Sequence, residues 1–96
     1  MNLAELSKQI GIDLVKDAED LEIVEGSYEF KIYTRDRAGN GMALKAWAEQ
    51  QSGQALASAH VYALRTLVED WRGQGPVALP GGGRVAREGG RLAFRM

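Results

Sequence analysis

The segment from Ser52 to Gly73 constrains the fold of this 96-residue chain more than any other. Its apolar side chains, joined by one histidine, recur at spacings of three and four residues, which places them along one side of a helix. They are Leu56, His60, Ala63, Leu64, Leu67, Val68 and Trp71. Ser52 suits the cap at the start of such a helix, and Gly73 suits the left-handed residue beyond its end. A helix of this length is marginal alone in water, so its apolar side predicts a sheet to pack on.

The opposite side of this helix is predicted to face water. It carries Tyr62, Arg65, Glu69 and Arg72. His60 is the only conventional general base in the chain, and its position on the apolar side favours a packed or boundary histidine over a catalytic one. Since no serine or carboxylate has a spacing typical of nucleophilic or paired-acid catalysis, we expect no catalytic residue, no cofactor and no enzymatic activity.

Residues 21–49 are predicted to form an antiparallel sheet. Gly26-Ser27 separates two alternating runs, a pattern typical of a tight hairpin, because glycine accepts the positive φ of the first turn position. Residues 42–49 are read as a third strand, and the helix over 53–72 is expected to cover one face of the sheet. That face carries Leu21, Ile23, Phe30 and Ile32.

The other face of the predicted sheet combines cations with aromatic rings. It is formed by Lys31, Tyr33, Arg35, Lys45 and Trp47. Aromatic and basic side chains anchor protein interfaces, and they also stack and neutralise single-stranded nucleic acid. We therefore predict that these residues bind a partner, with burial under the C-terminal strands or under a second subunit as the structural alternative.

The two ends of the chain carry opposite charge. Residues 1–20 are read as a helical segment that begins with a short amphipathic helix, and they include acids that form either a solvated face or an acidic interaction face: Asp13, Asp17, Glu19 and Asp20. Residues 77–96 are predicted to form a basic hairpin or arm that turns at Gly89-Gly90 and pairs Arg87 with Leu92 and Val85 with Phe94. Its interaction candidates are Arg84, Arg87, Arg91 and Arg95.

Composition limits the remaining classes. The chain has no cysteine and one histidine, which excludes disulfides and a multi-histidine metal site within one chain, and we predict no metal. We see no signal peptide and no apolar stretch approaching the roughly 20 residues that span a membrane, so we predict a cytoplasmic protein without membrane contact. Its length predicts a single domain over 1–96.

The predicted fold is α+β, in the order α-β-β-β-α, with the long helix on one face of the antiparallel sheet and a C-terminal β-hairpin. Residues 3–72 resemble double-stranded-RNA-binding domains in this order of elements. The lysines that mark the start of the last helix in that family are absent, since the chain has Gln51-Ser52-Gly53-Gln54-Ala55 there. The resemblance concerns topology and implies no function by itself.

Three functions are compatible with these features. Our leading hypothesis is a small non-enzymatic adaptor or inhibitor of the phage or mobile-element accessory type, for example anti-CRISPR-like, that covers a protein or nucleoprotein complex. The first alternative is a single-stranded nucleic-acid-binding module that uses the ring-and-cation face of the sheet. The second is a self-associating phage structural or assembly component, for which a homodimer is one form.

Overall fold

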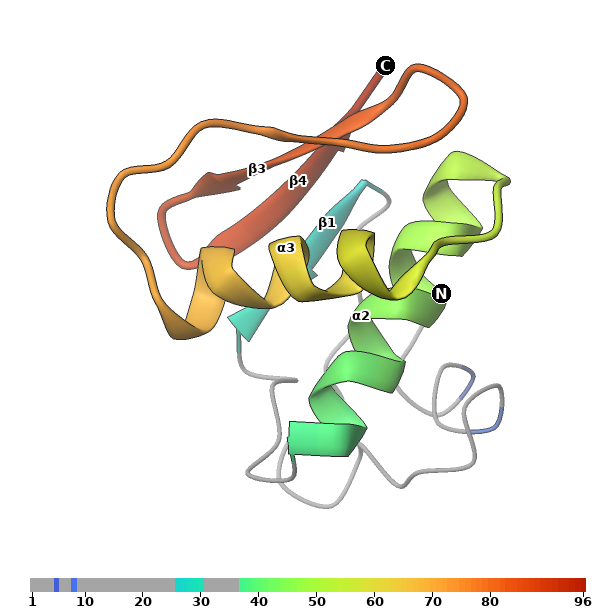
Figure 1. The fold of residues 1–96 in the computed structure, drawn as a ribbon, viewed down its shortest axis with the longest axis horizontal. Coiled ribbons are helices and arrows are strands. Elements are labelled where there is room, and N and C mark those ends of the chain that lie inside the picture. Colours follow the sequence, from blue (N-terminus) through green and yellow to red (C-terminus); the bar gives the residue numbers. More distant parts are fainter. Residues whose placement is uncertain (1–4, 6–7, 9–25, 31–36) are drawn as a thin grey trace.

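A computed structural model describes Glu5, Lys8, residues 26–30 and residues 37–96 (Figure 1). Glu5 and Lys8 are helical and exposed. The elements that follow are β1 (Ser27–Glu29), α2 (Arg37–Ser52), α3 (Ser58–Glu69), β2 (Val77–Ala78), β3 (Arg84–Glu88) and β4 (Arg91–Arg95). Two helices and a four-stranded antiparallel sheet confirm the α+β class. No helix among these residues is long and apolar enough to cross a membrane.

The strands lie in the order β1-β4-β3-β2, with every neighbouring pair antiparallel. The C-terminal hairpin has the predicted register, with Arg87 opposite Leu92 and Val85 opposite Phe94. Val77 pairs with Val85, so the hairpin is part of the sheet and is not a separate arm. Gly83 lets the chain return close to β4, because a Cβ at this position would overlap the Phe94 ring.

The predicted third strand over 42–49 is wrong, because these residues belong to α2. The segment is rich in alanine and in unbranched side chains, which favour helix over strand. Its buried residues also follow helical spacing: Ala43, Leu44, Trp47 and Ala48. The chain order in this region is therefore not that of double-stranded-RNA-binding domains, and β1 pairs with β4 at Ser27 and Ala93.

The long helix predicted over 53–72 is shorter, because α3 begins at Ser58 and ends at Glu69. Ser52 is not its cap. The Ser52 hydroxyl accepts a hydrogen bond from the Gln54 amide at 3.2 Å, in the turn after α2. The start of α3 is instead capped by His60, whose Nδ1 accepts a hydrogen bond from the Ala57 amide at 3.2 Å. His60 is thus a half-buried capping residue, close to the structural role predicted for it.

The core is formed by one side of each helix and one face of the sheet. The α3 helix packs against β2, β3 and α2. Its predicted apolar side is buried at Leu64 and Leu67, while Trp71 lies beyond the helix end and is 42% exposed. Each fully buried large apolar side chain contributes roughly 1.5 to 3 kcal/mol. The largest of them are Trp47, Tyr28, Leu44, Leu64, Leu67, Leu92 and Val85.

The hairpin predicted around Gly26-Ser27 falls largely outside the described residues. Gly26 has the predicted positive φ, at 82°. The strand expected before it, over 21–25, and the residues expected to pair there with Phe30 are not described. Phe30 itself is half-buried against the core, which agrees with its predicted apolar role.

Candidate functional site

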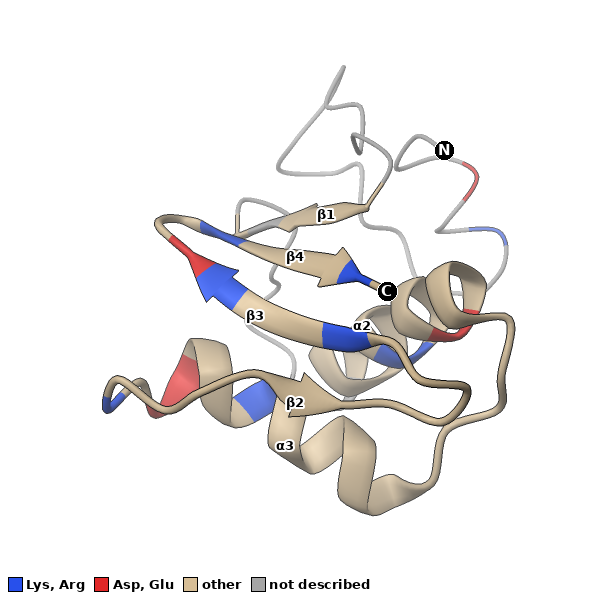
Figure 2. Ribbon diagram, turned by 90° about the horizontal axis from the view of Figure 1, so that it is seen from above, with Lys and Arg blue, Asp and Glu red and all other residues tan. Residues whose placement is uncertain are grey.

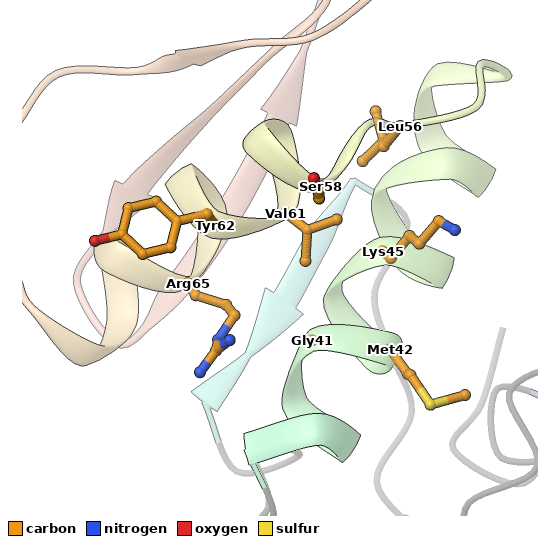
Figure 3. Close-up of a pocket in the computed structure, with 8 residues that line it drawn as sticks. All are labelled: Gly41, Met42, Lys45, Leu56, Ser58, Val61, Tyr62 and Arg65. Carbon is orange, nitrogen blue, oxygen red and sulfur yellow. The ribbon is translucent and has the colours of Figure 1, made fainter.

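A groove of about 390 Å³ runs between α2 and α3 (Figure 3). We call it the helix groove. Its apolar lining consists of Met42, Leu56 and Val61, and its polar lining consists of Lys45, Ser58, Tyr62 and Arg65. Gly41 completes the wall contributed by α2. A hollow of this size is typical of ligand sites, which are mostly apolar with a few placed polar groups.

Gly41 lies on the side of α2 that faces α3. A Cβ at Gly41 would lie 3.8 Å from both the Arg65 Cδ atom and a Val61 methyl group, so α2 approaches α3 closely here. Figure 3 shows Val61 between the two helices, Tyr62 extending along the outer side of α3, and Lys45 extending along the outer side of α2. The groove therefore has an apolar floor with a ring on one side and a cation on the other.

The net positive charge of the groove comes from Lys45. Its side chain is exposed and makes no ion pair within the described part of the chain. The Arg65 guanidinium lies 3.3 Å from the Glu69 carboxylate, in an i,i+4 ion pair on α3. An exposed ammonium beside an apolar floor suits an anionic ligand with a flat apolar part. Within the described residues, no group of His, Asp or Glu side chains is arranged to hold a metal ion.

The predicted ring-and-cation face is not assembled as expected. Lys31, Tyr33 and Arg35 lie outside the described residues. Lys45 is exposed, but Trp47 is 0% exposed and its ring centroid lies 5.5 Å from that of Tyr28 in the core. In a strand, residues 45 and 47 would share a face, whereas in a helix they point in nearly opposite directions. Trp47 therefore cannot be a contact residue.

Arg87 of the hairpin is half-buried and contacts other elements of the same chain. Its guanidinium lies 4.8 Å from the centre of the Phe30 ring and 5.0 Å from that of Trp71. Its Nη1 donates to the Leu67 carbonyl, in the last turn of α3, at 3.0 Å. These contacts use the side chain to join elements within the chain.

The other hairpin arginines are exposed: Arg84, Arg91 and Arg95. Figure 2 shows the basic positions of the hairpin toward the two ends of β3 and β4. Arg95 pairs with Glu88 at 2.9 Å, which offsets part of this charge. A partner contact by these three arginines stays a prediction. The predicted acidic face, Asp13, Asp17, Glu19 and Asp20, lies outside the described residues.

The sequence interpretation missed the helix groove. It correctly put Tyr62 on the side of the long helix that faces water, but the Arg65 side chain, expected on the same side, is only 22% exposed, and neither residue was assigned a function. Tyr62 is 69% exposed and Met42 is 45% exposed, which makes them two of the few large apolar side chains on the surface of the described chain. The available signal was an exposed aromatic on a helix whose opposite side already supplies the core.

A protein-family model matches the segment that contains both helices of this groove. The model of the TilS substrate-binding domain matches residues 38–93, which include nearly all of α2, the whole of α3 and most of the sheet. The chain belongs to the TilS substrate-binding domain family. The match covers more than half of the chain and contains each residue that lines the helix groove.

The curated relatives that match this TilS-family domain are named tRNA(Ile)-lysidine synthase. The tRNA(Ile)-lysidine synthase of Salinispora tropica is 51% identical over 57 residues, and that of Salinispora arenicola is 49% identical over 57 residues. Each alignment covers 57% of this chain and 17% of the relative. The Leifsonia xyli subsp. xyli protein of the same name is 48% identical over 42 residues, or 44% of this chain and 12% of the relative. No solved structure matches the chain significantly.

These findings correct the functional predictions. The adaptor or inhibitor hypothesis, with its phage and anti-CRISPR-like associations, is wrong, because the chain belongs to a substrate-binding domain family whose similar proteins are lysidine synthases. The expectation of no enzymatic activity is contradicted by the same relatives, which are named as an enzyme. It failed because a substrate-binding domain need carry no catalytic motif of its own. The family match also gives no support to a protein partner or to a homodimer.

Proposed function

We propose that this chain binds tRNA as the substrate-binding part of a tRNA(Ile)-lysidine synthase, and that the helix groove belongs to the RNA interface. The observation that carries the proposal is the TilS substrate-binding match over residues 38–93, which contains the whole groove. Because the chain covers only 17% of the Salinispora relatives, the synthase activity itself is proposed for a longer protein that includes this domain. Such a role implies a cytoplasmic location.

The chemistry of the helix groove supports this role. RNA offers phosphates to cations and flat bases to aromatic rings, and the groove has an exposed lysine, Lys45, and an exposed ring, Tyr62, on its two sides. Electrostatic binding to a polyanion requires accessible positive charge, and Lys45 has no ion pair among the described residues that would cancel it.

The test measures fluorescence anisotropy of a labelled tRNA(Ile) transcript against the 96-residue chain over a range of salt concentrations. We expect binding that weakens as salt rises. The Lys45→Gln variant should bind more weakly and lower the slope of log affinity against log salt by about 1, as expected for the loss of one phosphate contact. The absence of salt-sensitive binding to tRNA, even in low salt, would contradict the proposal.

A matched control is available at Arg72. This residue is exposed, lies outside the helix groove and pairs with Asp70 at 3.0 Å, so Arg72→Gln removes the same charge as Lys45→Gln at another place. We expect a smaller effect on affinity than that of Lys45→Gln. A double Arg84→Gln, Arg91→Gln variant tests the sheet surface. If only that variant weakened binding, the RNA would lie on the hairpin and not in the helix groove.

A further inference from the structure

We infer that the helix groove holds one unpaired nucleotide of the RNA, with its base on the apolar floor beside Tyr62 and its phosphate beside Lys45. This inference rests on the proposed function and adds to it the class of RNA element that enters the groove. It predicts that the domain distinguishes unpaired from paired RNA, which a purely electrostatic surface would not do.

The shape of the groove favours a single base over a duplex. A paired base is stacked above and below, and it presents only its edges to a protein surface, so its flat face cannot lie on a concave apolar floor. The floor formed by Leu56 and Val61, in a hollow of about 390 Å³, suits an isolated flat ring. Paired RNA would contact only the rim.

Tyr62 supplies the stacking surface. Its side chain is 69% exposed, whereas the apolar side of the same helix buries Leu64 and Leu67 completely. The ring therefore contributes little to the core. It extends along α3 and away from α2 at one side of the groove (Figure 3), where a base can stack on it. Met42, 45% exposed on the α2 side, offers an adaptable apolar contact to different bases.

Charge decides between a nucleotide and an uncharged apolar occupant such as a peptide side chain. Lys45 places an ammonium group at the rim that has no ion pair within the described residues, and an apolar peptide would leave it without a counterion. Ser58, in the first turn of α3, adds a hydroxyl that can bond to a phosphate or a ribose 2′-OH. A nucleotide satisfies both groups and the apolar floor together.

The experiment compares three RNA probes by anisotropy: a short hairpin with an unpaired loop, a fully paired duplex with the same number of nucleotides, and the hairpin with abasic loop nucleotides. We expect the wild-type chain to bind the intact hairpin most tightly. Tyr62→Ala should weaken hairpin binding about 5- to 150-fold, as for loss of one stacked base, while duplex binding changes less than about twofold. Tyr62→Phe keeps the ring and should keep the preference.

A second variant fills the groove without removing the ring. Gly41→Leu extends a side chain from a point 3.8 Å from Val61 and Arg65, and leucine is a better helix former than glycine, so circular dichroism should show a folded protein. We expect this variant also to lose the preference for the hairpin.

The outcomes separate the two proposals. If no probe and no tRNA binds, the proposed function fails. If tRNA binds but hairpin and duplex bind equally, or if the preference survives both Tyr62→Ala and Gly41→Leu, the proposed function stands and the unpaired nucleotide does not occupy this groove.

Discussion

Trp47 shows how one side chain can decide between a structural and a contact role. It is fully buried and packs on Tyr28 at a ring angle of 59°. We expect Trp47→Ala to lower the free energy of unfolding by about 3–5 kcal/mol, because the cavity left by a large ring cannot close completely. Urea denaturation followed by circular dichroism measures this change.

Tyr62→Ala is the matched control for this measurement. The ring is 69% exposed, so its removal should change the free energy of unfolding by no more than about 0.5 kcal/mol. Similar losses for the two variants would contradict the assignment of Trp47 to the core and Tyr62 to the surface.

At the scale of elements, Arg87 joins the end of α3 to the sheet. It donates to Leu67 near the end of α3, where backbone carbonyls lack helical partners, and it lies beside both the Phe30 and Trp71 rings. We expect Arg87→Met, which keeps an unbranched apolar stem, to lower the free energy of unfolding by about 2 kcal/mol through loss of the cation–π contacts and this hydrogen bond. Thermal and urea denaturation measure the loss.

Arg84→Met, at the exposed start of β3, provides the comparison for Arg87→Met. Its expected effect on the free energy of unfolding is within about 0.5 kcal/mol. An equal effect at the two positions would mean that the ring contacts of Arg87 contribute nothing to stability.

The elements also differ in how well the sequence predicts them. The β3–β4 register followed from the sequence because the Gly89-Gly90 turn and the alternation of Val85, Leu92 and Phe94 agree. The α2 helix was missed because its apolar residues fit two periods. Met42, Leu44, Ala46 and Ala48 alternate as in a strand, while Ala43, Leu44, Trp47 and Ala48 follow a helix. The helix propensity of these residues favours the helical period, and it would have decided between the two.

The helix groove could not be predicted from local patterns. Lys45 and Tyr62 lie on different helices, and they line one groove only because α2 packs against α3. Because the strand assignment moved Lys45 to a sheet, the sequence interpretation placed it beside Trp47, which is buried. Lys45 as a contact residue thus stays a prediction, and the aromatic neighbour predicted for it, Trp47, is buried.

At the scale of the whole molecule, one core connects every described layer. Leu44 and Trp47 of α2, Leu64 of α3, and Val85 and Leu92 of the sheet belong to the same buried cluster. A helix that unfolded alone would expose the buried faces of the other helix and of the sheet. Unfolding one element therefore also destabilises the elements packed against it. We therefore expect the chain to unfold in one cooperative transition, as the prediction of a single domain over 1–96 requires.

The measurement of this cooperativity uses a Trp71→Phe variant, in which Trp47 is the only tryptophan. Circular dichroism then reports the helices and fluorescence reports the centre of the core during one urea titration. Coincident midpoints are expected, since Trp47 lies where the helices and the sheet meet. A loss of helix signal at lower urea than the fluorescence change would show that α3 separates from the sheet first. The two walls of the helix groove would then not be held by one rigid unit, and a groove that depends on the packing of α2 against α3 would be lost before the core.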